Sequence, residues 1–223
     1  MFLLLMIIIL IIPAVAQLKV TTSYNKYRNI DSEKGLTGQE VARNILDEHG
    51  LQNVYVVETN GTLTDHYDPS RKVVRLSQDI YRGTSIASAA VAAHECGHAI
   101  QDQEGYAFMR FRSIIFPVVR ICTSLSYFII LIGIIAEAFN VIHLGIAFVG
   151  TGLVFQIVTL PVEFDASRRG ENELTKLSLI SPLEEMDAKN MLDAAAQTYV
   201  AGVLSSALEL LRLILIFGGS DRR

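Results

Sequence analysis

The sequence has no tryptophan, only two cysteines and comparatively few charged residues. Of its 223 residues, 19% are charged, whereas 51% are hydrophobic. This balance is too apolar for an ordinary soluble domain, and it excludes intrinsic disorder, because disordered chains combine low hydrophobicity with high charge. Two cysteines cannot build a disulfide framework, and Cys122 lies in an apolar stretch where a thiol usually packs as a small hydrophobic group.

Basic residues are also not concentrated anywhere in the chain. The formal net charge is -4, and no run of Lys or Arg is longer than a pair such as Arg168-Arg169. Nucleic acids are bound by a basic face that neutralises their phosphates. The charge distribution therefore argues against a nucleic-acid partner.

The hydrophobic residues are gathered in four long blocks, which is typical of a membrane protein. They cover residues 2–16, 114–136, 141–160 and 199–217. A helix needs about 20 apolar residues to cross the hydrocarbon core, so the two middle blocks predict a transmembrane helical hairpin. The first block is short for a span. The fourth contains Glu209 and Arg212, which can pair on one helical face; it is expected to span the membrane or, alternatively, to lie buried or at the interface.

Three helices are expected in the more polar segments. Thr37 and Glu40 form a capping box ahead of a helix over 38–49. An Ala-rich run without proline predicts a helix over 85–103. Ser181-Pro182-Leu183-Glu184 is a second capping box with proline at the first helical position, so a further helix should begin there.

Between the first two of these helices, the hydrophobic period changes to that of strands. Residues 53–59 and 72–77 are apolar runs, separated by the turn signal Asn60-Gly61 and the break Asp68-Pro69. The pattern predicts a short β-hairpin or meander. The expected fold class is therefore α+β: a mainly helical membrane protein with about four transmembrane helices and a small β-hairpin or meander beside the Ala-rich helix.

The Ala-rich helix contains His94-Glu95-Cys96-Gly97-His98, a match to the HExxH pattern of zincins. Residues four apart lie about 40° apart around a helix, so both imidazoles can reach one zinc ion. Glu95 would flank the metal and act as the general base that takes a proton from the attacking water. A chance match is disfavoured, because the chain has only five histidines and the motif lies on the required helix.

A catalytic zinc ion needs a third protein ligand and an open position. Glu104 has the spacing found in one known arrangement, but on a continuous helix it would point to the wrong face. Asp68, His66 and Glu58 lie on the expected hairpin, where surface or turn roles are the simpler interpretation.

Glu163 is the remaining candidate, and topology favours it. Pro161 suits the start of a helix, which would place Glu163 in the first turn. Two spans separate His98 from Glu163, so the chain returns to the same side of the membrane. The alternative for an acid in a first turn is a role as partner of the helix dipole.

Together these residues resemble a known family. The chain is similar to the YugP-type neutral zinc metallopeptidases, membrane proteins of bacteria and archaea. The resemblance lies in the segments 92–101 (AAHECGHAIQ) and 160–169 (LPVEFDASRR), in the hairpin that precedes the first segment, and in the two spans inserted between the segments. The resemblance covers nearly the whole chain. It implies a gluzincin-type endopeptidase that binds one zinc ion, with His94, His98 and Glu163 as ligands and Glu95 as base.

The layout is also similar to HtpX-like and CAAX-prenyl membrane proteases, in which a Glu-x-x-x-Asp helix follows a pair of spans. This chain departs from that pattern, because Ser167 stands four residues after Glu163 and the nearest acid is Asp165. Either residue could support a zinc-bound histidine through a hydrogen bond. The oxyanion donor or substrate contact is left open among Arg168, Arg169, Tyr67, His66 and Tyr199.

The distribution of basic residues predicts the orientation in the membrane. The turn 137–143 has no Lys or Arg, whereas the expected catalytic side carries Lys19, Lys26, Arg28, Arg110, Arg112, Arg168 and Arg169 near span ends. By the positive-inside rule, we expect a multi-pass protein of the cell membrane with a cytoplasmic active site. Ala14-Val15-Ala16 could be a signal-peptide cleavage site, but no basic residue precedes the apolar run, which favours an uncleaved anchor.

Five regions are therefore expected. They are an N-terminal transmembrane anchor (1–17), a catalytic region (18–113), a transmembrane hairpin (114–160), a third-ligand helix with a connecting segment (161–198), and a C-terminal transmembrane or interfacial helix and tail (199–223). The expected partners are a peptide or protein substrate, either free or associated with the membrane, the lipid bilayer, and a membrane protein or a second copy in a complex.

Two rival functions compete with proteolysis. The first is a non-catalytic zinc-binding scaffold or sensor in which HExxH only holds metal. The second is a transporter or channel component, suggested by Glu209, Arg212, Gln156 and His143 within apolar blocks. Because these four lie on different spans, pairing between helices is the better explanation for them.

Overall fold

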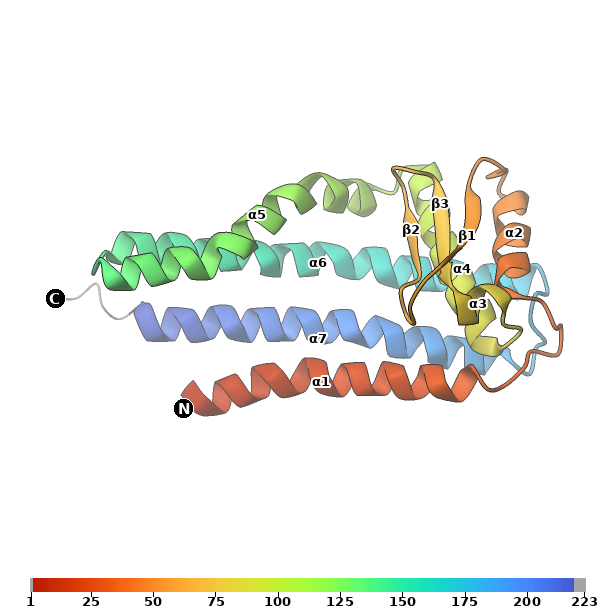
Figure 1. Cartoon of the computed structure of the whole chain (residues 1–223), viewed down its shortest axis with the longest axis horizontal. Coiled ribbons are helices and arrows are strands. Elements are labelled where there is room, and N and C mark those ends of the chain that lie inside the picture. The colour runs from red at the N-terminus through yellow and green to blue at the C-terminus, as the bar shows by residue number, and fades with distance from the viewer. Residues whose placement is uncertain (1, 219–223) are drawn as a thin grey trace. The chain divides into compact units, whose positions relative to one another are not determined.

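The computed structural model describes residues 2–218, and the chain divides into two compact units. A helical unit comprises Met1–Gln17, Arg110–Pro161 and Thr198–Arg223, and a mixed unit comprises Leu18–Met109 and Val162–Gln197. The elements in chain order are α1 (Phe2–Tyr27), α2 (Gly38–Glu48), β1 (Tyr55–Thr59), β2 (His66–Asp68), β3 (Val73–Ser77), α3 (Gln78–Arg82), α4 (Ile86–Glu104), α5 (Ala107–Ile135), α6 (Phe139–Lys176) and α7 (Glu185–Phe217) (Figure 1). The predicted α+β class is confirmed. Met1 and the expected tail beyond residue 218 lie outside the described residues.

Within the described residues, four helices, α1, α5, α6 and α7, are long and apolar enough to cross a membrane. This number agrees with the prediction. Their large apolar side chains are widely exposed, for example Leu10 at 68% and Ile114 at 72%. Exposed apolar surface on this scale is unfavourable in water and suits lipid.

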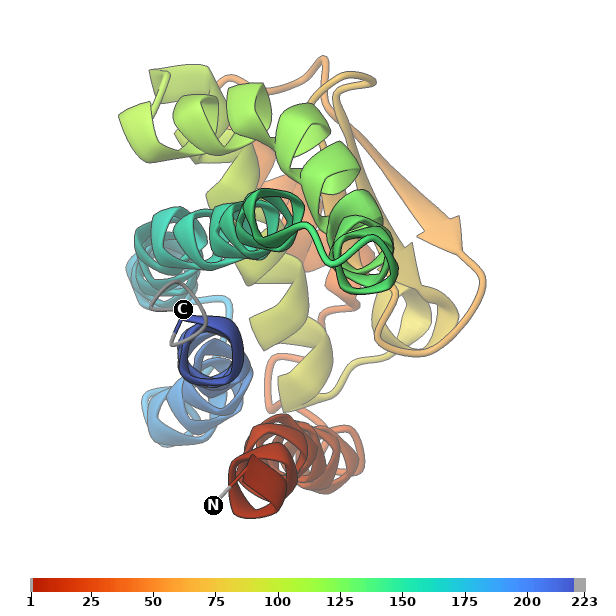
Figure 2. The ribbon, with the colours of Figure 1, turned by 90° about the vertical axis from the view of Figure 1, so that its left-hand side faces the viewer.

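In the helical unit, α5 and α6 form the expected hairpin, seen nearly end-on in Figure 2. The two helices approach closely at glycines: a Cβ on Gly145 would lie 2.5 Å from a side-chain carbon of Ile130. The predicted pairing on α7 is also present, since Arg212 donates to both oxygens of Glu209 at 2.6 and 2.8 Å. Tyr127 of α5 donates to the same carboxylate at 2.6 Å, which adds a hydrogen bond between α5 and α7 to this ion pair.

The sheet of the mixed unit has the strand order β1-β3-β2. β2 and β3 form the expected antiparallel hairpin around the Asp68-Pro69 break. The alternative of a meander, in which each strand would pair antiparallel with the next along the chain, is not observed, because β1 pairs in parallel with β3. β3 is the most buried strand, and a central position allows both neighbours to pair with it. Asp65 accepts from the backbone N–H of Ser77 at 2.7 Å, which holds the crossing loop against the end of β3.

Helix α4 is the centre of the mixed unit. Its N-cap is Ser85, and it ends at Gly105 in the left-handed conformation. Its small side chains are buried against α2, whose predicted capping box between Thr37 and Glu40 is present. Cys96 packs here fully buried, and burial raises the pKa of its thiol. A thiol in such a position is unreactive.

The structure corrects two predicted helix starts. Pro161 lies inside α6, which continues unbroken from Phe139 to Lys176, so Glu163 is not in a first turn and the dipole interpretation fails with it. A proline removes only one backbone hydrogen bond, which a long, well-packed helix tolerates. Helix α7 begins at Glu185 rather than at Pro182. The carboxylate of Glu184 is engaged by the backbone N–H groups of Ser181 and Glu33, which holds the preceding residues in a turn.

Candidate metal centre

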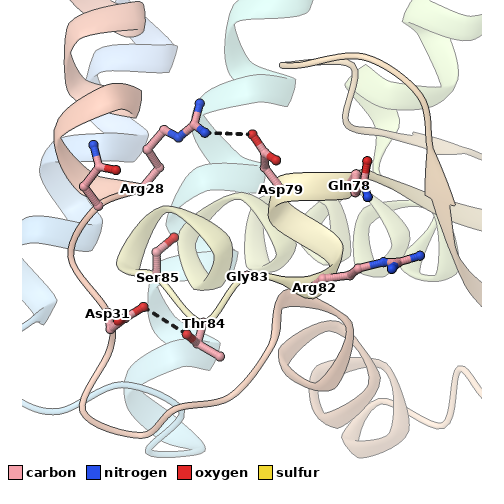
Figure 3. Close-up of a pocket in the computed structure, with 9 residues that line it drawn as sticks. Arg28, Asp31, Gln78, Asp79, Arg82, Gly83, Thr84 and Ser85 are labelled. Atoms are coloured by element: carbon pink, nitrogen blue, oxygen red, sulfur yellow. Dashed lines mark hydrogen bonds and ion pairs between the residues drawn. The ribbon is translucent and has the colours of Figure 1, made fainter.

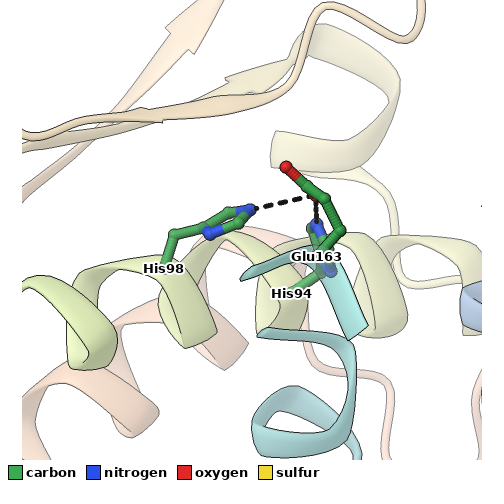
Figure 4. A group of neighbouring side chains, drawn as sticks. All are labelled: His94, His98 and Glu163. Atoms are coloured by element: carbon green, nitrogen blue, oxygen red, sulfur yellow. Dashed lines mark ion pairs between the residues drawn. The ribbon is translucent and has the colours of Figure 1, made fainter. Parts of the chain in front are cut away.

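In the mixed unit, His94 and His98 of α4 and Glu163 of α6 come together (Figure 4). The Nε2 atoms of His94 and His98 lie 3.5 and 3.4 Å from Oε2 of Glu163. One ligand atom from each residue lies within 4.8 Å of the other two. His98 and Glu163 are buried and His94 is half-buried. Three side chains able to bind a metal thus face one point below the protein surface.

The spacing of these atoms suits a zinc ion. In a tetrahedral site with bonds of about 2.0–2.2 Å, neighbouring ligand atoms lie about 3.3–3.6 Å apart, which matches the two nitrogen–oxygen distances. Two imidazoles and one carboxylate are a donor set that zinc prefers, and three ligands leave a fourth position open. Within residues 2–218, no other group of three His, Cys, Asp or Glu side chains is gathered in this way.

Two glycines allow α4 and α6 to approach closely enough for this geometry. A Cβ on Gly97 would lie 2.4 Å from the carbonyl oxygen of Ala166, and a Cβ on Gly170 would lie 2.8 Å from the carbonyl carbon of Ala93. Such distances are far below van der Waals contact. The backbones of α4 and α6 are therefore in contact on both sides of the site. This contact places Glu163 next to the face of α4 that bears the two histidines.

The second ring nitrogen of each histidine has its own partner. Nδ1 of His94 lies 3.1 Å from Oγ of Ser167, and Nδ1 of His98 lies 3.1 Å from Oε1 of Gln101. Asp165 contacts neither ring; it accepts from Nε2 of Gln101 at 2.9 Å. Sequence reasoning missed Gln101, although its position three residues after His98 on one helix was a usable signal.

Glu95 is buried beside the two histidines, with 7% of its surface exposed. Its carboxyl accepts a hydrogen bond from the backbone N–H of Tyr67 in β2. Burial raises the pKa of Glu95 to about 7, an effect partly opposed by the nearby charge of His94. A carboxyl with this pKa can both accept and return a proton near neutral pH.

The other candidate third ligands lie elsewhere or have different partners. Glu104 pairs with Arg169, and Glu58 pairs with an arginine of α3. Asp68 accepts from backbone N–H groups in the β2–β3 turn, while His66 is exposed and contacts a backbone carbonyl through Nδ1. None of them joins the group around His98.

Three of the five candidate oxyanion donors donate hydrogen bonds to acidic side chains. Arg168 and Arg169 both donate to Asp165. The hydroxyl of Tyr67 donates to Asp102 at 2.7 Å. A role for any of them in catalysis stays a prediction.

An open polar pocket of about 540 Å³ lies at the start of α4 (Figure 3). Its lining includes the ion pair of Arg28 with Asp79 and the hydrogen bond from Thr84 to Asp31. His94, His98 and Glu163 are not part of this lining. The pocket is therefore distinct from the candidate metal centre.

Comparison with known proteins identifies the family of this chain. The family described as "Putative neutral zinc metallopeptidase" matches residues 2–218. The chain is 46% identical over 202 residues to the "Putative membrane protease YugP" of Bacillus subtilis (strain 168), with 91% of this chain and 90% of that protein covered. No solved structure matches it. With its four apolar helices this is a membrane protein, and the chain belongs to the family of neutral zinc metallopeptidases.

Proposed function

We propose that this protein is a membrane-bound zinc endopeptidase. The observation that carries the proposal is the convergence of His94, His98 and Glu163, with the buried carboxyl of Glu95 beside them. A zinc ion held by those three side chains would supply a Lewis acid that polarises the scissile carbonyl and lowers the pKa of water.

Glu95 supplies the proton transfer. As a carboxylate it takes a proton from the attacking water, and as the acid it gives that proton to the leaving amine. A pKa of about 7 suits both steps, because neither protonation state is then strongly disfavoured. The backbone N–H of Tyr67 holds the carboxyl in place for the transfer.

The sheet offers a means of holding an extended substrate. β2 lies at the edge of the sheet, and the backbone N–H of Tyr67 within it donates to Glu95, so this edge borders the proposed base. A peptide that adds to such an edge is recognised mainly through its backbone. Substrates N-methylated at the amides flanking the scissile bond should be cut more slowly; equal cleavage of both series would reject strand addition.

The decisive experiment compares membranes that contain the wild-type protein with membranes that contain Glu95→Gln. Terminal-peptide proteomics should show new termini only with the wild type, since loss of a general base costs about 10²–10⁴ in rate. Zinc content should be equal in both proteins. Glu48→Gln, an exposed acid on α2 that pairs with Lys176, is the control and should keep full activity. If Glu95→Gln leaves cleavage intact, a zinc-binding scaffold or sensor becomes the better explanation.

We further propose that the protein is a multi-pass protein of the cell membrane and that its site faces the cytoplasm. The reason is that basic residues near the span ends lie on the catalytic side, and such residues favour the cytoplasmic side of a membrane. Ser70→Cys in the exposed β2–β3 turn, in a background with Cys122→Ala, gives a maleimide target in the mixed unit while Cys96 stays buried. An impermeant maleimide should label it in inverted vesicles and not in intact cells. The intact mass of the extracted protein would show whether residues 1–16 are retained.

A further inference from the structure

We propose that Gln101 is the positioning residue of the metal centre: it fixes the proton of the His98 ring on Nδ1 and fastens α6 on both sides of Glu163. Gln101 is fully buried, with 0% of its surface exposed. Its Oε1 lies 3.1 Å from Nδ1 of His98. Its Nε2 donates to the carbonyl of Val162 at 2.8 Å and to Oδ2 of Asp165 at 2.9 Å.

The direction of these hydrogen bonds defines the state of His98. A carbonyl and a carboxylate can only accept, so the Gln101 atom that faces Val162 and Asp165 must be the nitrogen. Both amide hydrogens are then used, and the amide oxygen is left to accept from His98. That bond requires a proton on Nδ1, so in a neutral ring the lone pair is on Nε2, the atom that lies 3.4 Å from Oε2 of Glu163.

The same amide also ties the two helices together at the third proposed ligand. Val162 precedes Glu163, and Asp165 follows it by two residues. Asp165 also accepts from Arg169, which in turn donates to Glu104 of α4 at 2.7 Å. The network therefore runs from α4 to α6 and back, and its single contact with a ligand ring is the bond from His98 to Gln101.

This arrangement differs from that of the other histidine. Nδ1 of His94 is served by one hydroxyl on α6, Oγ of Ser167. A hydroxyl can donate or accept, so Ser167 alone does not define a tautomer. The amide of Gln101 defines the tautomer of His98, because both of its N–H donors are already occupied and only its oxygen is left to accept.

The inference rests on the proposed zinc site, and it can be tested first without zinc. The imidazole ¹⁵N shifts of metal-free wild-type protein at pH 8, with His98 assigned by its absence in His98→Gln, should show a proton on Nδ1 of His98. A neutral ring protonated at Nε2 alone would overturn the proposal, whatever any variant does. A purely packing role for Gln101 predicts no preference for either form.

Zinc affinity provides the second measurement, made by competition with a chelator on the purified protein in detergent. Gln101→Met fills a similar volume but accepts no hydrogen bond, and it should weaken zinc binding about 10–100-fold while abolishing the Nδ1–H signal. Gln103→Met is the matched control, because Gln103 lies two residues further along α4 and donates to the carbonyl of His49. It should change neither quantity.

Gln101→Glu tests the assignment by partial rescue, since its carboxylate can again accept from His98 but cannot donate to Val162. The Nδ1–H signal should return. An affinity of Gln101→Met within about twofold of the wild type, or equal losses in the two Met variants, would reject the positioning role. Failure of the proposed function looks different: the wild-type protein itself would then bind no zinc, or would keep its affinity in His94→Gln.

Discussion

Oγ of Ser167 on α6 lies 3.1 Å from Nδ1 of His94 on α4. Ser167 is buried, with 8% of its surface exposed, so water does not readily replace it. The hydroxyl can accept from Nδ1–H and leave Nε2 of His94 directed to Glu163, 3.5 Å away. The two histidines thus receive their outer hydrogen bonds from different helices, His94 from α6 and His98 from its own.

We expect Ser167→Ala to weaken zinc binding about two- to tenfold. The reason is that a neutral hydrogen bond contributes about 0.5–1.5 kcal/mol net, and the variant leaves Nδ1–H of His94 without that acceptor. Chelator competition on the purified protein measures the change. Ser70→Ala, in an exposed turn, is the control and should bind zinc normally. An unchanged affinity in Ser167→Ala would mean that another group orients His94.

The features that could be predicted from the sequence are those with local physical causes. The capping box of Thr37 and Glu40 and the Ala-rich run around His94 each specify a helix from neighbouring residues alone. The four apolar helices follow from composition and length. Glu163 could be selected only because two spans return the chain to the same side of the membrane, an argument that is topological rather than local.

The features that could not be predicted depend on contacts distant in sequence. The order β1-β3-β2 is set by which strand is most buried, and Asn60-Gly61 carries no information about that. The continuation of α6 through Pro161 depends on packing over the whole helix. Gln101 gains its role only when α6 brings Asp165 to within 2.9 Å of it. No rule based on sequence spacing predicts this contact between Gln101 and Asp165.

Removal of zinc should destabilise the protein. A ligand that binds only the folded state contributes about 2.7 kcal/mol at a free concentration of 100 times its Kd. We therefore expect the thermal midpoint, followed by circular dichroism in detergent, to fall after treatment with a chelator and to recover with added zinc. His94→Gln, His98→Gln and Glu163→Gln should each abolish or strongly reduce this recovery.

The control for the zinc experiment is an acid that the structure places outside the site. Glu48→Gln removes an exposed carboxylate paired with Lys176 and should leave the zinc-dependent shift intact. If Glu163→Gln and Glu48→Gln behave alike, Glu163 is not a ligand.

The stability of the mixed unit should depend on the ionisation of Glu184. Burial raises the pKa of Glu184, but hydrogen bonds from the backbone N–H groups of Ser181 and Glu33 and from the hydroxyl of Ser32 outweigh it and lower the pKa overall. A lowered folded-state pKa gives stability that is present above the ordinary pKa of about 4.3 and is lost as the pH falls through the folded value.

Glu184→Gln tests that dependence. At pH 7 it should cost about 1–3 kcal/mol, because the neutral amide accepts more weakly and its NH₂ faces backbone donors. Below about pH 4 the difference from the wild type should shrink. Thermal melts at several pH values measure both effects. A constant difference between pH 7 and pH 3 would show that the charge of Glu184 is not what stabilises the turn.

Gly97→Ala should damage the metal centre without touching a proposed ligand. The new Cβ would lie 2.4 Å from the carbonyl oxygen of Ala166, so α4 and α6 must separate. Overpacking of this kind costs about 1–3 kcal/mol, and it moves Glu163 away from the histidines, so zinc affinity should fall together with stability. Gly150→Ala is the control: its Cβ meets nothing closer than a carbon of Leu210 at 3.9 Å, and both quantities should stay near wild type. Loss of stability in Gly97→Ala with unchanged zinc affinity would show that the site tolerates separation of the helices, and the close crossing would then serve packing alone.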